Sequence, residues 1–154
     1  MYLLFKIVAL LPLSLLQLIA SWIAILLNSY NSSMKRITRI NLQLAYPNLS
    51  TQQQEIFIKN SLKSQCMTYV ESIKCWGMPP EYNLALLKNI YSEQYFTEAL
   101  ANKKGVIVVI AHFGCWELLN AWLNLYSSPM IMYKPNKNKG IDRFMLEARQ
   151  RLNA

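Results

Sequence analysis

Several residue types on which common sites depend are scarce in this sequence. Its 154 residues include one histidine and three cysteines, and the spacing of the cysteines matches neither a disulfide framework nor a set of metal ligands. We therefore expect reduced thiols, a reducing compartment, and neither a metal nor another cofactor. Cys115 could in principle be a thiol nucleophile, but no base is aimed at it, which favours a small residue at a crowded turn.

Acidic residues are also scarce. Asp and Glu total 8 against 16 Lys and Arg, which gives a formal net charge of +8. This balance favours anionic partners, whether phosphate groups, anionic lipids or acidic proteins. The chain shows no helix-turn-helix or zinc-finger spacing and no basic stripe interleaved with stacking aromatics, so we expect no nucleic acid among its partners.

A long uncharged run is present near the N-terminus. No residue from Ile7 to Met34 is charged, and 7–27 is almost wholly apolar. That stretch is long enough to span a bilayer. It is also longer than the apolar region of a cleaved signal peptide, and no small-x-small cleavage site follows it. We predict an uncleaved membrane anchor helix within 1–30 and one further domain over 31–154. Pro12 would either kink the first turns of the anchor or leave them along the interface before the span begins.

The charges that flank the apolar run predict its orientation. Only Lys6 precedes the run, whereas Lys35, Arg36 and Arg39 follow it. The positive-inside rule then predicts a single-pass protein whose body is cytoplasmic. The same cluster would contact anionic headgroups, where each charge contributes about 1 kcal/mol near the surface. A merely solvated helix face is the alternative interpretation of these three residues.

Helical patterns fill the first part of the body. Apolar spacing, capping residues and Pro or Gly stops predict four helices, over 34–45, from Ser50 or Thr51 to Gly77, over 82–90 and over 93–101. Within the second of these, Glu71 would by itself be interpreted as a surface carboxylate.

The pattern changes after the fourth helix. Residues 106–111 form a continuous β-branched run, typical of a strand buried on both faces. Helical spacing follows over 115–125, then a second candidate strand over 129–133 and a basic helix over 141–152. The succession of strand, tight turn and helix predicts an α/β layered fold, of which these are the first strands.

Residues suited to acid–base chemistry follow the first predicted strand. His112, the only histidine, lies on the turn after it, and Glu117 lies in the first turn of the next helix. A neutral imidazole can accept a proton from a hydroxyl if a carboxylate fixes its tautomer from the other ring nitrogen. The carboxylate also stabilises the imidazolium that forms. A lone histidine is more often structural, but a carboxylate five residues later favours a catalytic pair.

The segment 105–120, which reads GVIVVIAHFGCWELLN, closely resembles the HX4E block of the late lipid A (lauroyl/myristoyl) acyltransferases. Histidine, four residues and an acid form a weak motif alone. A preceding apolar run and the residues Phe113, Gly114 and Trp116 make it specific. Further agreement extends over nearly the whole chain, at Arg39, Asn41, Leu42, 45–50 (AYPNLS), Glu71, Tyr133, Lys134, Pro135 and the helix that carries Arg143 to Arg151.

The resemblance implies transfer of a fatty acyl chain from acyl carrier protein, or from coenzyme A, to a hydroxyl of a lipid A precursor. It places this reaction in lipopolysaccharide biosynthesis, at the cytoplasmic face of the bacterial inner membrane. His112 would be the general base and Glu117 its partner, with no acyl-enzyme. Arg149 is the candidate for binding a substrate phosphate, because a guanidinium donates two parallel bonds. Arg143 and Arg151 are alternatives, and a solvated helix face remains open for all three.

Family members are close to twice this length, so the resemblance implies an acyltransferase domain that is truncated after its first strands. We therefore expect the 154-residue chain itself to be inactive and poorly folded around its sheet. Two other functions stay open: an acyltransferase for another glycolipid, because the motif reports the reaction rather than the acceptor, or a non-catalytic membrane-anchored remnant.

Overall fold

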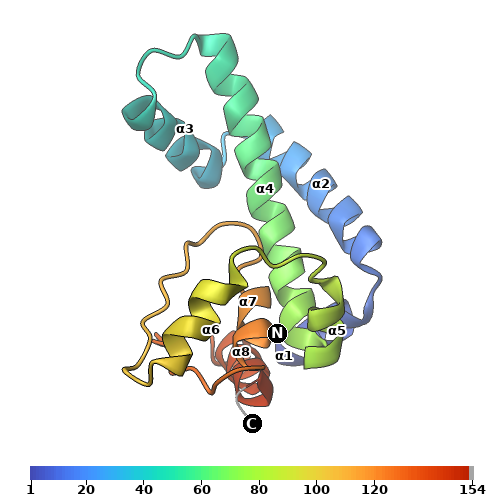
Figure 1. The fold of residues 1–154 in the computed structure, drawn as a ribbon. Helices are drawn as coiled ribbons and strands as arrows, with labels where there is room; N and C mark the ends of the chain where they lie inside the picture. Colours follow the sequence, from blue (N-terminus) through green and yellow to red (C-terminus); the bar gives the residue numbers. More distant parts are fainter. Residues whose placement is uncertain (153–154) are drawn as a thin grey trace. The chain divides into compact units, whose positions relative to one another are not determined.

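The structure, a computed structural model, describes residues 1–152, and all regular secondary structure in that range is α-helical (Figure 1). The helices are α1 (Tyr2–Leu10), α2 (Leu13–Ser29), α3 (Ser33–Ala45), α4 (Thr51–Gly77), α5 (Pro80–Leu86), α6 (Glu93–Ala101), α7 (Leu118–Leu123) and α8 (Lys139–Leu152). They form two compact units, Leu11–Ser72 and Met1–Leu10 together with Ile73–Ala154.

The unit Leu11–Ser72 contains α2, α3 and most of α4. Its core joins Ala20 and Ala24 of α2 to Cys66 of α4, with Leu27, Met67 and Val70 packed around them. Small alanine side chains let the two helices approach closely. Beside this core, the Gln17 amide donates a hydrogen bond of 2.9 Å to Glu71. Glu71 therefore has a partner in the fold, which the sequence alone did not indicate.

The local signals for α3 and α4 are confirmed. Ser32 caps α3 by accepting a hydrogen bond from the backbone N–H of Lys35. At the start of α4, the Ser50 hydroxyl accepts from the backbone N–H of Gln53, and the Gln53 side chain accepts in return from the backbone N–H of Ser50. This reciprocal pair is a capping box. The helix ends at Gly77, as predicted.

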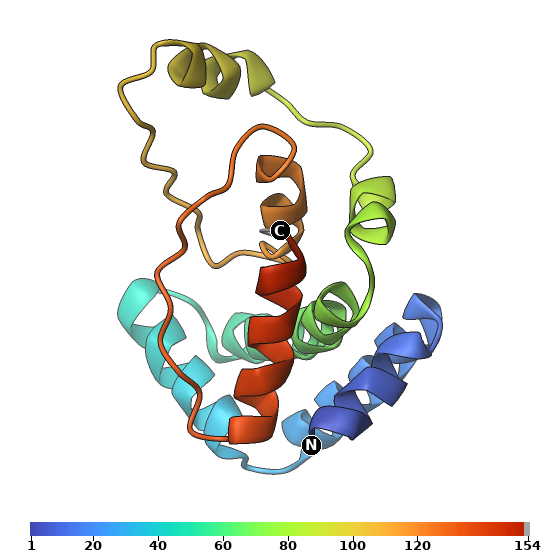
Figure 2. The ribbon, with the colours of Figure 1, turned by 90° about the horizontal axis from the view of Figure 1, so that it is seen from below.

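In the second unit, α1 packs on α8 (Figure 2). Phe144 of α8 is almost completely buried, and the rings of Tyr2, Phe5 and Trp76 meet it edge-on. The Tyr2 hydroxyl and Lys6 of α1 also bind Glu147 of α8. The hydrogen bond from Tyr2, followed by those from Arg143 and Lys6, holds the pKa of Glu147 at about 2.

Helix α1 also contacts α4 in this unit. Lys74 is buried, and its ammonium donates to the carbonyl of Ala9 over 2.7 Å. Burial lowers the pKa of Lys74. A Cβ added at Gly77 would lie only 2.0 Å from the Cβ of Ala9, so Gly77 permits a contact that no larger residue could make. Helix α1 is thus held to the unit by both polar and apolar contacts.

The predicted α/β fold is wrong. Within residues 1–152 there is no strand, and both 106–111 and 129–133 lack regular structure. Ile107, Val109 and Met130 are each more than nine-tenths exposed. The physical reason is that β-branched residues favour an extended backbone only where a neighbouring strand accepts and donates the ladder hydrogen bonds. Neither segment has such a neighbour among residues 1–152.

The predicted single anchor helix is also wrong. Helix α1 ends at Leu10 and α2 begins at Leu13, so Pro12 breaks the run that was predicted to be continuous. Proline has no backbone N–H and disfavours a helical residue before it. Among the described residues no single helix is long and apolar enough to cross a membrane, although α1 and α2 together pass that test by length and composition.

The boundaries of the remaining helices differ by a few residues at most from those predicted. Helix α6 has the predicted bounds, and α8 begins two residues earlier than expected. The helix predicted over 82–90 already ends at Leu86, because Leu87 is extended. The helix predicted over 115–125 is confined to Leu118–Leu123, which leaves Glu117 at its N-cap position.

Candidate active site

Glu117 is the most enclosed of the predicted site residues. Only 1% of its surface is exposed. The guanidinium of Arg149 donates to one carboxylate oxygen over 2.9 Å, and the Asn120 side chain donates to the other over 2.8 Å. Asn120 reaches Glu117 because it lies one helical turn further along α7, and it is itself buried. Both carboxylate oxygens are therefore occupied, and the burial of this charge is compensated.

His112 lies in a different environment. It is exposed, on a segment without regular structure, and its ring meets the edge of the Trp116 ring at a centroid distance of 5.0 Å. The following turn passes through Gly114, whose φ of +60° favours glycine. Within the described residues no hydrogen bond joins His112 to Glu117. The structure therefore does not bring the predicted catalytic pair together, and their joint role stays a prediction.

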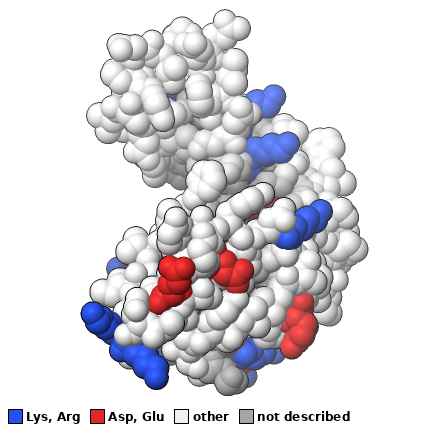
Figure 3. Space-filling view, in the orientation of Figure 1, with Lys and Arg blue, Asp and Glu red and all other residues white. Residues whose placement is uncertain are grey.

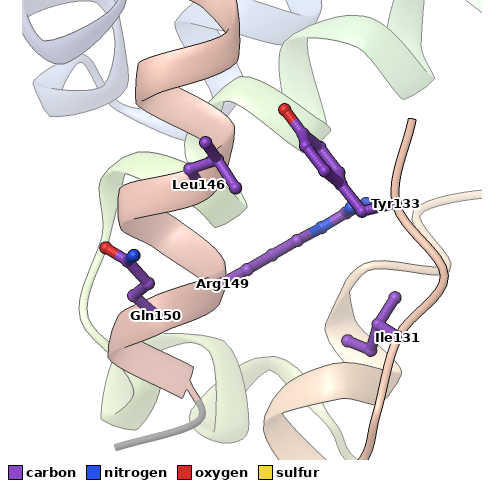
Figure 4. A pocket seen from close by; sticks show the side chains of 5 residues that line it. All are labelled: Ile131, Tyr133, Leu146, Arg149 and Gln150. Atoms are coloured by element: carbon purple, nitrogen blue, oxygen red, sulfur yellow. The ribbon is translucent and has the colours of Figure 1, made fainter. Parts of the chain in front are cut away.

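Arg149 connects Glu117 to a cavity. Its side chain is 12% exposed, and its guanidinium lies 5.5 Å from the centre of the Tyr133 ring. The cavity has a volume of about 300 Å³ and is lined by Ile131, Tyr133, Leu146, Arg149 and Gln150. Figure 4 shows Arg149 extending from α8 toward Tyr133 on the facing segment. The Nε atom of Arg149 is buried, and no group within residues 1–152 accepts a hydrogen bond from it.

Asp142 of α8 holds the segment that contains Tyr133 and Asn136. Its carboxylate accepts hydrogen bonds from the Tyr133 hydroxyl and from the backbone N–H of Asn136. Both bonds lower the pKa of Asp142. The hydrogen bond between the two side chains also raises the pKa of Tyr133. Because Asp142 lies in the first turn of α8, the helix dipole also favours its negative charge. The Tyr133 side of the cavity is thereby tied to the helix that carries Arg149.

The alternative arginines are engaged elsewhere. Arg143 pairs with Glu147 over 3.0 Å and lies over the Tyr2 ring. Arg151 donates to the backbone carbonyls of Trp76 and Glu147. Of the three predicted phosphate ligands, Arg149 alone contacts Glu117 within the described residues, so the structure distinguishes it from the other two.

Two cysteines complete the surroundings of Glu117. A hydrogen bond with Cys115 raises the pKa of the Cys75 thiol, with further contributions from burial and from the nearby negative charge of Glu117. Neither of these two cysteines is in a disulfide. Cys75 and Asn120 were missed by sequence reasoning. The position of Asn120 three residues after Glu117 was a usable signal, whereas nothing in the spacing indicated Cys75.

The site thus combines a buried carboxylate held by a guanidinium with an exposed histidine five residues before it, residue types suited to general-base chemistry. The sequence model of the family described as bacterial lipid A biosynthesis acyltransferase matches residues 1–154. The chain belongs to this family of acyltransferases, as the sequence predicted.

Characterised relatives agree with the family. The chain is 27% identical to the lipid A biosynthesis lauroyltransferase of Escherichia coli K12 over 78% of its own length and 40% of that protein. It is 25% identical to the lipid A biosynthesis palmitoleoyltransferase of the same organism over 93% of its length and 46% of that protein. A lipid A biosynthesis acyltransferase of Haemophilus influenzae is 26% identical over 76% of the chain and 37% of that protein. The chain therefore spans less than half the length of these relatives.

Proposed function

We propose that this chain takes part in transferring a fatty acyl chain to a hydroxyl of a lipid A precursor, at the cytoplasmic face of the bacterial inner membrane. The observation that carries the proposal is the family match over residues 1–154, which includes the segment with His112 and Glu117. The acyl donor would be a thioester of acyl carrier protein or coenzyme A. The net charge of +8 suits both an acidic protein donor and a phosphorylated acceptor.

His112 would act as the general base. Its imidazole accepts the proton of the acceptor hydroxyl while that oxygen attacks the thioester carbonyl. The carbon–sulfur bond then breaks, and the imidazolium returns the proton to the departing thiolate. No covalent acyl-enzyme is needed, because the substrate hydroxyl occupies the place that a serine nucleophile has in a catalytic triad. The exposure of His112 in the structure leaves its ring accessible to substrate.

Glu117 would orient His112 without giving up its present partners. A carboxylate has about four acceptor positions, of which the hydrogen bonds from Arg149 and Asn120 use one on each oxygen. A third bond from the imidazole requires the turn 112–116 to move toward Glu117. Gly114, with its positive φ, is a suitable residue to permit that movement.

Arg149 would bind a phosphate of the acceptor. Its position on the cavity and the unpartnered Nε atom support this role, since a guanidinium has five donors and Glu117 occupies only one edge of it. The apolar Ile131 and Leu146 line the same cavity. A phosphate and an adjoining apolar group of one lipid could therefore both find suitable contacts there.

An acyl-transfer assay tests the proposal. The purified chain, and the same chain joined to the remaining part of the E. coli lauroyltransferase, would be supplied with acyl carrier protein thioester and a lipid A precursor. In whichever form is active, His112→Ala should lower kcat by about 100- to 10,000-fold. The control Lys104→Ala, on an exposed residue of the preceding turn, should leave it unchanged. Parental turnover by His112→Ala would refute the assignment.

The same assay distinguishes the role of Arg149 from that of Arg143 and identifies the preferred acceptor. Arg149→Lys should raise KM for the phosphorylated acceptor more than it lowers kcat, whereas Arg143→Lys should change neither. Turnover of another glycolipid in preference to the lipid A precursor would place the chain on a different acceptor. Absence of turnover in both forms, with intact helical structure, would favour a non-catalytic role.

A further inference from the structure

Helix α3 has two faces of different character. The face toward its own unit contains Thr38, which is buried and accepts a hydrogen bond of 3.4 Å from Gln65 of α4. Met34 and Leu42, one turn before and one turn after Thr38, are partly covered on the same face. Thr38 thus attaches this face of α3 to α4.

The opposite face is apolar. Ile37, Ile40 and Leu44 are 54%, 48% and 78% exposed. Their spacing of three and four residues places them in one stripe on the side of the helix away from Thr38. A helix on the surface of a water-soluble protein normally carries polar residues on that side. The surface over α3 also shows no acidic side chain in the view of Figure 3.

The charges beside this stripe are basic. Lys35 and Arg39 both pair with Glu55 of α4, over 3.7 Å and 2.8 Å, and Arg39 in particular lowers the pKa of Glu55. Arg36 makes no ion pair within residues 1–152 and is exposed next to the stripe. Two cations share one carboxylate and a third is unpaired, so this end of the unit has an excess of positive charge.

The neighbouring helix of the same unit indicates which kind of partner covers the stripe. Helix α2 contains no charged residue and exposes large apolar side chains, among them Leu18, Trp22 and Leu26. It is joined to α3 by a short turn and contacts it. An uncharged apolar helix followed by a basic helix with an apolar stripe matches the change from hydrocarbon to anionic headgroups in a bilayer.

We propose that α3 lies in the plane of an anionic lipid surface, with Ile37, Ile40 and Leu44 inserted among the upper parts of the acyl chains and Arg36 at the phosphates. The three basic residues Lys35, Arg36 and Arg39 therefore have different roles. Lys35 and Arg39 hold α3 to α4 through Glu55, and Arg36 faces lipid. This surface is separate from the residues of the proposed reaction.

A cysteine scan of α3 in the full chain tests the proposal. Cysteine would be placed singly at Ile37, Ile40, Leu44 and Gln43, with Cys115 changed to Ser, and labelled with an environment-sensitive nitrobenzoxadiazole dye. The labelled proteins would be reconstituted with vesicles of equal parts phosphatidylglycerol and phosphatidylcholine. Quenching by aqueous iodide should fall several-fold at the three stripe positions. It should stay high at Gln43, which is the matched control on the flank of the same helix.

Each alternative gives a distinct result. Equal iodide quenching at all four positions would overturn the proposal, because the stripe would then face water. Protection without vesicles that grows with protein concentration would also overturn it, in favour of a second copy of the chain. Protection that is as strong in pure phosphatidylcholine would refute the anionic preference. Circular dichroism of each variant should confirm that the helices are retained.

Discussion

Two neighbouring regions of the candidate site differ sharply in how they are held. Glu117 is enclosed by α7 and α8, and the buried Asn120 and the mostly covered Arg149 donate hydrogen bonds to its carboxylate. His112, five residues earlier, lies on an exposed segment, and its ring contacts the ring of Trp116. The electrostatic part of the site is therefore built into the fold, whereas the proposed base, His112, lies on a segment that the described residues leave largely unsupported.

The largest expected difference between the two regions is in amide hydrogen exchange. No backbone hydrogen bond pairs residues 106–110 with another segment in the range that the structure describes, so their amides should exchange near the rate of an unfolded chain. The amides of Asn120 to Leu123, in the buried helix α7, should exchange at least about a hundredfold more slowly. Mass spectrometry of the two peptides measures this. Slow exchange across 106–110 would show strand pairing that the structure lacks.

A smaller effect, on the free energy of unfolding, is expected when Asn120 is substituted. Asn120→Ala removes a buried hydrogen bond to the Glu117 carboxylate and should lower the free energy of unfolding by about 1.5–3 kcal/mol. Asn124→Ala is the control, since it lies one turn later on the same helix and donates only to a backbone carbonyl. Its loss should be about 0.5–1.5 kcal/mol. If urea denaturation gave the same loss for both variants, Asn120 would have no special role in holding Glu117.

The smallest expected effect is on the pH dependence of thermal stability. The pKa of Glu147 is about 2 in the folded chain, below its usual value of 4.5, because Tyr2, Arg143 and Lys6 favour the charged form. A depressed pKa contributes stability above the unfolded value, and that contribution is lost as pH falls from about 4.5 toward 2. The Tm difference between the parent chain and Glu147→Gln should therefore shrink over this interval. Glu98→Gln, at an exposed position, should show no such trend.

The sequence predicted helices better than the sheet because helix signals are local. The capping box at Ser50 and Gln53 and the stop at Gly77 act within one turn. The β-branched run 106–111 carries an equally clear preference, but a strand also needs hydrogen-bonding neighbours that no local pattern supplies. The anchor prediction failed at Pro12, which was expected to kink the first turns or leave them along the interface and instead separates two helices.

The candidate site was predicted as a set of residues but not as an arrangement. His112, Glu117 and Arg149 were all identified, yet Glu117 was expected to contact His112 and instead contacts Arg149. These two residues lie 32 positions apart, and their contact depends on the packing of α8 in the unit. Sequence spacing constrains neighbours along one helix, and it does not determine contacts of that kind.

A double-mutant cycle on Glu117 and Arg149 tests most directly whether these two residues form a pair in solution. Either Glu117→Leu or Arg149→Met leaves a buried charge without its partner, and each should lower the free energy of unfolding by about 3–5 kcal/mol. The double variant should lose much less than the sum, whereas the exposed pair Arg143 and Glu147 should show almost no coupling. Strong coupling between Glu117 and Arg149 is the predicted result. Simple additivity of the two losses would show that the buried pair at the centre of the site does not exist in solution.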